Sequence, residues 1–200
     1  ALYRAPAASA PAEPAAPVPR ARVSWGLVLM FVVFLGQTGF WAYSIQQVTR
    51  QGVTAQESAY AVAFCKAVAG CYLLARMNGK PASHHGVRMP GLVVMAAVAA
   101  MSFAQDLAGF LVGMLAWELG FNILSARLQA LVTQDNPTIA GRWLAGSVIL
   151  GAAAGPALHG MALAAGAGGL FIMLSVLSPL LPWCWVSLRR WRSKENALAA

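Results

Sequence analysis

The chain has 200 residues, of which 59% are hydrophobic and only 10% are charged, and its mean hydropathy is +0.63. Soluble domains typically carry about 25% charged residues, so this composition excludes an ordinary soluble fold. The net charge of +8 does not indicate nucleic-acid binding, because the Lys and Arg residues stand in short blocks between apolar runs and not on one basic face with stacking aromatics. We therefore expect an integral membrane protein whose surroundings are a lipid bilayer, with no nucleic acid among its partners.

The first 23 residues differ from the rest, since Ala5 to Arg22 consists almost wholly of Ala and Pro. The stretch has neither the apolar core of a signal peptide nor enough hydrophobicity to fold, which is typical of a linker. We predict a cytoplasmic linker over 1–23, a transmembrane domain over 24–188 and a basic cytoplasmic tail over 189–200. Because the chain starts at Ala1 without a Met, we expect a further segment before it.

Six apolar runs follow, most of them near the roughly 20 residues that a helix needs to cross a bilayer. The hydrocarbon offers no water to backbone groups, so these runs must be helices, and the period-2 alternation of barrel strands is absent. The expected fold class is an all-α membrane protein with six transmembrane helices. The third run is short and begins at Pro90 or as early as Val87. The predicted spans are Ser24–Ile45, Ala55–Ala75, Pro90–Ala104, Leu107–Leu131, Trp143–Ala165 and Gly168–Leu188.

Positive charges fall almost wholly on one side of the predicted bundle. Of the 14 Lys and Arg residues, all but Arg50 and Lys66 lie toward the side that holds both chain ends. Cytoplasmic loops of membrane proteins are enriched in Lys and Arg, so this asymmetry predicts that both termini are cytoplasmic. We expect a multi-pass protein of the plasma (inner) membrane.

Two full charges, Lys66 and Glu118, lie near the middle of apolar runs. A charge at the bilayer centre costs at least ~2.5–3.5 kcal/mol on insertion scales, so it usually faces a bundle interior, a partner or a water-filled path. Both residues lie about eleven positions from the outer end of their spans, so they share a depth and can meet if the two helices adjoin. Two interpretations stay open, a structural pair or a site for a solute or proton.

Polar residues gather on single faces of four spans. Steps of three and four residues place side chains on one side of a helix, and such faces occur in spans one, two, four and five, whereas spans three and six have almost nothing comparable. We expect the four polar helices to surround something polar, and the other two to face lipid or support the bundle. The candidate residues for solute or proton binding are Glu118, Lys66, Asn122, Gln37, Trp41 and His159.

The fifth span carries small residues next to a proline. Gly151 and Gly155 indicate either close helix packing or a substrate path, and Pro156 removes a backbone donor, so we expect this helix to bend or loosen. His159, one turn further on, is either a packed histidine or a proton-responsive group. Trp41 is either an interfacial anchor or a surface on which a solute stacks.

No metal or cofactor is expected. The three cysteines fall within apolar runs without the spacing of a zinc site or a disulfide framework, which is typical of Cys acting as a small hydrophobe. His84 and His85 lack further ligands nearby in the sequence.

A Pro/Ala-rich linker followed by six helices, with polar faces on the first, second, fourth and fifth, resembles the carboxy-terminal half of a major facilitator superfamily (MFS) transporter. FLGQTGFWAYSIQQV (34–48) is similar to the seventh helix of bacterial members, and ARMNGKPASHHGVR (75–88) to the basic Gly-containing loop, here without its acidic residue. GAAAGPALHG (151–160) is similar to the Gly-Pro motif of drug/proton antiporters, with His159 replacing the first glycine of its final pair. The resemblance implies alternating access, in which two halves rock about a midplane site.

These features predict a secondary active transporter of a small solute, with Glu118 and His159 as candidates for proton coupling. The other half of the cavity is expected from an N-terminal six-helix half or a second copy of the chain. The alternatives are a permease subunit or scaffold that works with a partner and, less favoured, an intramembrane hydrolase. No enzyme is expected, because Ser147 and His159 lie ~18 Å apart along one helix, too far to hydrogen-bond. An anion, a zwitterion and a drug-like molecule fit the charges equally.

Overall fold

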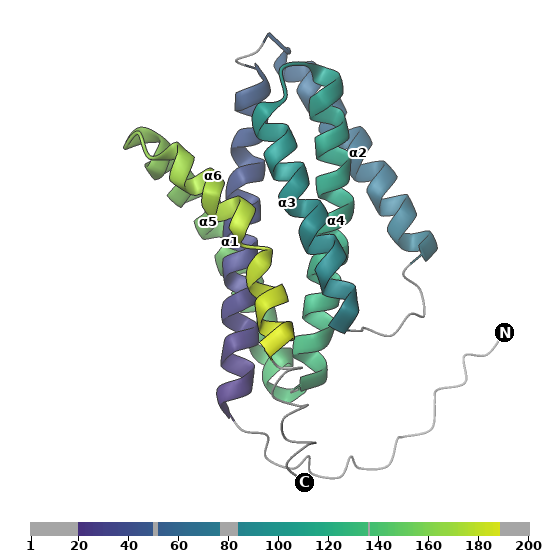
Figure 1. Ribbon diagram of the computed structural model, residues 1–200, viewed down its shortest axis with the longest axis vertical. Helices are drawn as coiled ribbons and strands as arrows, with labels where there is room; N and C mark the ends of the chain where they lie inside the picture. The colour runs from purple at the N-terminus through teal and green to yellow at the C-terminus, as the bar shows by residue number, and fades with distance from the viewer. Residues whose placement is uncertain (1–19, 50–51, 77–83, 136, 189–200) are drawn as a thin grey trace, which may run out of the picture.

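The computed structural model describes residues 20–49, 52–76, 84–135 and 137–188, which are helical almost throughout and contain no strand. The helices pack side by side and run alternately in opposite directions. The start of α1 and the end of the last helical stretch therefore lie at the same end of the bundle (Figure 1). The helices are α1 Arg20–Thr49, α2 Ala55–Arg76, the short 3-10 turn η1 His84–Val87, α3 Arg88–Phe103, α4 Leu107–Asp135, α5 Pro137–Ala164 and α6 Gly168–Leu177.

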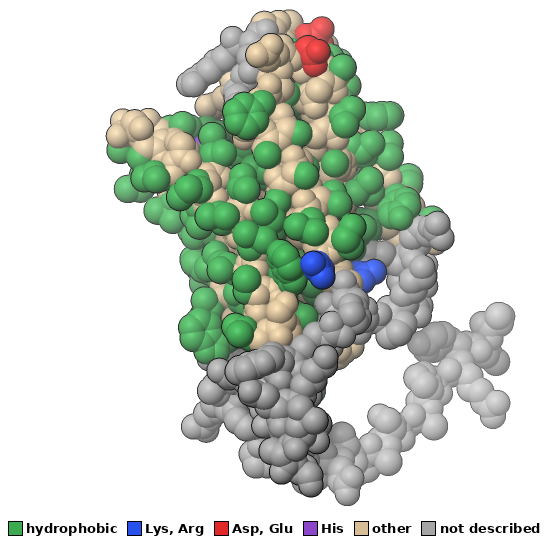
Figure 2. Space-filling model, in the orientation of Figure 1, with side chains coloured by type: hydrophobic (Ala, Val, Ile, Leu, Met, Phe, Trp, Pro, Cys, Tyr) green, Lys and Arg blue, Asp and Glu red, His purple; other side chains and the backbone are tan. Residues whose placement is uncertain are grey.

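Within the described residues, five helical stretches are long and apolar enough to cross a membrane, and Arg88–Phe103 is a shorter apolar helix. Large hydrophobic side chains cover much of the visible surface between the two ends of the bundle, as lipid contact requires (Figure 2). The prediction of an all-α protein built from apolar, membrane-length helices is confirmed. The third span is the one that is shorter than the usual crossing length.

Helices α1, α4 and α5 extend several residues beyond the predicted apolar runs. α1 begins at Arg20, within the predicted linker, and α5 begins at Pro137, before the predicted start at Trp143. Proline suits the first position of a helix, because its missing N–H would have no partner there. Most of the stretch between the fourth and fifth predicted spans is therefore helical, since α4 continues to Asp135.

The sixth span is not one continuous helix. We predicted a helix over Gly168–Leu188, but α6 ends at Leu177 and helix resumes only over 180–188. Pro179 lies in the break, and proline has no N–H to continue a helical ladder. The interruption leaves Ser178 beside α1, where its hydroxyl takes part in a buried network described below.

α1 is the central helix, since it contacts each of the other five. Its closest approach is to α5, where a Cβ placed on Gly151 would lie 2.5 Å from the Phe31 carbonyl oxygen and one on Gly155 would lie 2.8 Å from the Gly39 amide nitrogen. Only glycine permits backbones to approach so closely. Of the two interpretations of this stripe, the structure supports close helix packing.

α5 runs without interruption through Pro156. The missing proline N–H leaves the Ala152 carbonyl without its usual donor one turn on. The Thr38 hydroxyl of α1 donates to the Phe34 carbonyl at 2.7 Å and also lies 3.3 Å from the Ala152 carbonyl oxygen. A neighbouring helix thus supplies the polar partner that lipid cannot.

Two carboxylates at one end of the bundle cap the N-termini of helices. Glu57 and Thr54 form a reciprocal capping box at the N-terminus of α2, with the Thr54 N–H donating to Glu57 Oε2 at 2.9 Å and the Glu57 N–H donating to Thr54 Oγ1 at 3.2 Å. Asp106 Oδ1 accepts the Gly109 N–H at 2.7 Å at the start of α4. Figure 2 shows acidic side chains at this end and basic ones in the other half of the visible face.

Gly155→Ala is expected to destabilise the bundle by about 1–3 kcal/mol, because the added methyl group meets α1 backbone that cannot move aside. Gly146→Ala in the same helix is the matched control, since a Cβ there has nothing within 4 Å. Thermal unfolding of both variants in detergent measures the difference. Equal stabilities would contradict the close α1–α5 packing.

Candidate functional site

The two charges predicted to share a depth form an ion pair. Lys66 Nζ of α2 lies 2.8 Å from Glu118 Oε1 of α4. Each residue is eleven positions beyond the first residue of its helix, Ala55 or Leu107, so parallel packing of α2 and α4 from a common starting level brings them together. The contact that the sequence left open is therefore present.

The pair is asymmetric in exposure and in the number of its contacts. The Glu118 side chain is 4% exposed, whereas that of Lys66 is 50% exposed. Asn122 Nδ2 donates to Glu118 Oε2 at 3.1 Å and to the Glu118 carbonyl at 2.7 Å, which fixes the carboxylate from one helical turn away. Within the described ranges the Lys66 ammonium is the one polar partner of Glu118 Oε1, and it supplies the counter-charge of the carboxylate.

Trp41 of α1 completes this group of side chains. The Lys66 Nζ lies over its ring, 5.0 Å from the centroid, in the geometry of a cation–π contact. Four of the six candidate residues thus come together from three helices. We call them the charged cluster, which consists of Trp41, Lys66, Glu118 and Asn122.

Gln37 lies elsewhere, in a buried network. Its Nε2 donates to the Ser175 carbonyl at 2.6 Å and to Ser178 Oγ at 3.0 Å, and its Oε1 accepts the Trp117 Nε1–H at 2.8 Å. These bonds join α1, α4 and the break after α6. We predicted almost nothing in the sixth span comparable to the polar faces of the other spans, yet Ser175 and Ser178 are buried partners of Gln37. The sequence feature that could have indicated this polar site is a pair of serines three residues apart, the second of them directly before a proline.

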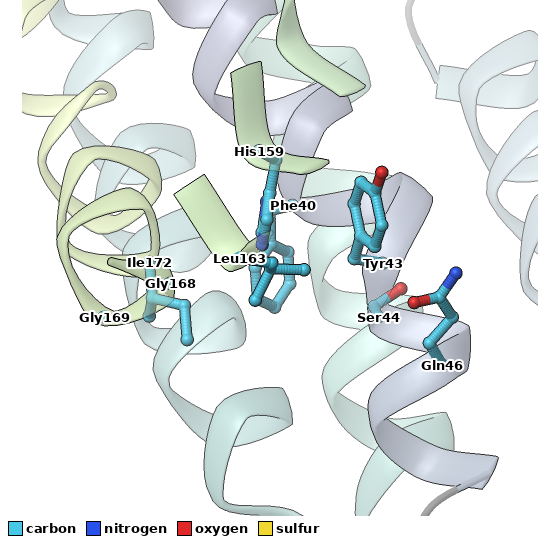
Figure 3. A pocket seen from close by; sticks show the side chains of 9 residues that line it. All are labelled: Phe40, Tyr43, Ser44, Gln46, His159, Leu163, Gly168, Gly169 and Ile172. Atoms are coloured by element: carbon cyan, nitrogen blue, oxygen red, sulfur yellow. The ribbon is translucent and has the colours of Figure 1, made fainter. Parts of the chain in front are cut away.

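His159 belongs to α5 and packs against a different side of α1 from that of the charged cluster. Its buried ring stacks on Tyr43 at 4.7 Å between centroids and packs against Phe171 at 4.3 Å. Figure 3 shows it at a cavity of about 330 Å³ between α1 and the hairpin of α5 and α6. Tyr43 and Trp41 are two residues apart on one helix and so point in widely different directions. The structure does not bring His159 into the charged cluster.

The described residues contain no group of three His, Cys, Asp or Glu side chains placed to hold a metal. The side chains of His84 and His85 lie outside the described residues. The three cysteines are free, with Cys65 buried and Cys71 and Cys184 exposed. Cys65 helps to join α2 to α4, since its thiol lies 3.7 Å from the Leu111 carbonyl oxygen.

No known protein family, curated protein or solved structure matches the chain. The description of this protein therefore rests on its own geometry. It is a bundle of apolar helices, most of them long enough to cross a membrane, with an ion pair eleven residues beyond the first residue of both α2 and α4.

Gln37→Leu is expected to cost about 1–3 kcal/mol of stability, because it leaves the buried Trp117 N–H without an acceptor. Adding Trp117→Phe removes that orphaned donor, so the double variant should lose less than the sum of the two single variants. Thermal unfolding of the four proteins gives the coupling. Additive losses would show that the two side chains are not paired.

His159→Phe is expected to change stability by less than about 1 kcal/mol, because the replacement ring keeps both aromatic contacts and removes an Nδ1 that has no partner, which offsets the loss of the imidazole's contact with the Gly39 backbone. Thermal unfolding measures this, with His159→Ala as the contrast that empties the space between the rings. A loss for His159→Phe as large as for His159→Ala would show that the imidazole makes an essential polar contact.

Proposed function

We propose that the chain is a six-helix half of a secondary active transporter that moves a small solute across a membrane by alternating access. The observation that carries the proposal is the half-exposed Lys66 at mid-length of a membrane-length helix, paired with the buried Glu118. A charge at that depth is costly when it faces hydrocarbon. The side of α2 that bears Lys66 therefore needs water or protein against it.

The distribution of burial supports an open side in the isolated chain. The most apolar windows of α2 and α5 are only 28% and 17% buried, against 50% for α1 and 44% for α4. Exposed apolar residues on these two helices suit lipid or protein equally, but the ammonium of Lys66 does not suit lipid. A second six-helix body, either an N-terminal half or another copy of this chain, would enclose the charged cluster in a shared cavity.

The resemblance to the carboxy-terminal half of an MFS transporter supports the same proposal. It accounts together for the Pro/Ala-rich stretch, the number of apolar runs and the gathering of polar residues on particular helices. In this arrangement both termini are cytoplasmic, as the distribution of Lys and Arg predicts. The charged cluster then lies near the midplane, where such transporters hold their solutes.

Uptake into proteoliposomes tests the proposal and identifies the solute in the same experiment. The complete native protein that contains this chain is reconstituted, a cell metabolite extract is added outside, and the lumenal contents are identified by mass spectrometry. We expect at least one solute to accumulate, and Glu118→Gln to reduce its uptake by at least about tenfold, because the buried counter-charge of Lys66 is lost.

Glu57→Gln is the matched control. It makes the same change of carboxylate to amide in a residue that caps α2, where Gln also serves in a capping box. Uptake should remain near that of the wild type. If no extract component accumulates above empty liposomes, or if Glu118→Gln transports normally while remaining folded, the transporter proposal is wrong. Retained activity of a bound partner in that case would favour the scaffold or permease subunit.

A further inference from the structure

The ammonium of Lys66 occupies a position that a free organic cation would also fit. It contacts the Glu118 carboxylate at 2.8 Å and lies over the Trp41 ring at 5.0 Å from the centroid. A carboxylate and an aromatic face are the two groups that recognise organic ammonium ions. We propose that the solute of this site is an organic cation, and that Lys66 is a tethered occupant which the solute displaces.

The two partners of the ion pair differ in how firmly they are held. Glu118 is buried and is fixed through Oε2 by Asn122, whereas Lys66 is half-exposed and sits on a flexible stem. The Lys66 ammonium can therefore leave toward the exposed side of α2 while the carboxylate stays in place. Glu118 Oε1, whose counter-charge is Lys66, is the negatively charged atom with which the incoming cation pairs.

Exchange of one cation for another never leaves the buried carboxylate unpaired. Removal of one partner from a buried ion pair is strongly destabilising, because the remaining charge is uncompensated. A solute cation that arrives as Lys66 departs avoids that state. The site is then closed by its own side chain when no solute is present.

An anionic solute fits the same geometry less well. The charge of Lys66 is already neutralised by Glu118, and an anion reaching the ammonium would approach that carboxylate. It would also meet the face of Trp41, whose ring carries a negative quadrupole on its faces. Both groups that favour a cation disfavour an anion.

Chemical rescue of Lys66→Met tests the inference. Benzyltrimethylammonium is the probe, because its charge does not depend on pH, and benzenesulfonate is the matched aromatic anion. The variant lacks the counter-charge of Glu118, so it should unfold at a lower temperature than the wild type. The cation should raise its unfolding temperature, since a ligand that binds the folded state stabilises it. Benzenesulfonate and sodium chloride at the same concentration should not.

The Trp41 contact is tested in the same background. Lys66→Met with Trp41→Leu should require at least about fivefold more cation for the same rescue, as the loss of a cation–π contact implies. Lys66→Met with Trp143→Leu is the control, because Trp143 is 63% exposed on α5 and lies outside the charged cluster. Equal rescue of the two double variants would contradict a role for Trp41.

A second measurement uses the wild-type protein and does not depend on the folding of a variant. Acetylation of Lys66 by an amine-reactive ester is followed by peptide mass spectrometry, with the peptide that contains Lys194 as the internal reference. Displacement from Glu118 should increase the rate at Lys66 at least about twofold with benzyltrimethylammonium and leave it unchanged with benzenesulfonate. A rate that is unchanged or lowered by the cation overturns the inference, as does rescue of Lys66→Met by the anion.

The inference rests on the proposed transporter for its biological meaning, but both measurements detect binding at equilibrium. A protein that shows rescue and displacement without any uptake into liposomes would refute the transport proposal alone. Glu118-dependent uptake of an anion, without rescue by the cation, would refute only the assignment of solute class.

Discussion

The ion pair between Lys66 and Glu118 is the constraint on which the arrangement of α2 depends. A carboxylate that is only 4% exposed needs a counter-charge, and Lys66 provides it. α2 is otherwise poorly covered, with 28% of its most apolar window buried. The pair and the neighbouring Cys65 contact therefore fix α2 against α4 at one register. The same pair places a half-exposed ammonium at mid-depth, where contact with lipid hydrocarbon is unfavourable. The ion pair that fixes α2 is therefore also the basis of the proposed function.

α1 separates three environments that its sequence places only a few residues apart. Gln37 faces the break after α6, Trp41 faces the charged cluster and Tyr43 packs on His159. A helix turns about 100° per residue, so Tyr43 points away from the face that Gln37 and Trp41 share one turn apart. Close contact with α5 holds α1 in its orientation, because the glycines at 151 and 155 allow the two backbones to approach. The polar partner that Thr38 offers to the Ala152 carbonyl belongs to the same interface.

Sequence reasoning about the candidate site succeeded where the relevant information is local. The common depth of Lys66 and Glu118 follows from counting along two helices, and their contact is observed. Reasoning from helical faces failed to separate Gln37 from Trp41, which share a face but have different partners. The partners of Gln37 are up to 141 residues away in the chain, so no local pattern could reveal them. The break at Ser178 and Pro179 was equally hidden, because proline is tolerated in membrane helices and does not always end them.

By itself, the sequence determined that this is an all-helical protein of apolar, membrane-length segments, because hydropathy and the need to satisfy backbone groups act within each segment. It also determined that two opposite charges lie at equal depth. Only the tertiary structure decided which helices adjoin, and so which polar groups meet. Glu118 is compensated by Lys66 and Asn122, Gln37 is saturated within the packing of α1 and α6, and His159 is enclosed by aromatic rings. Those outcomes depend on helix pairing, which is set by contacts between residues far apart in the chain.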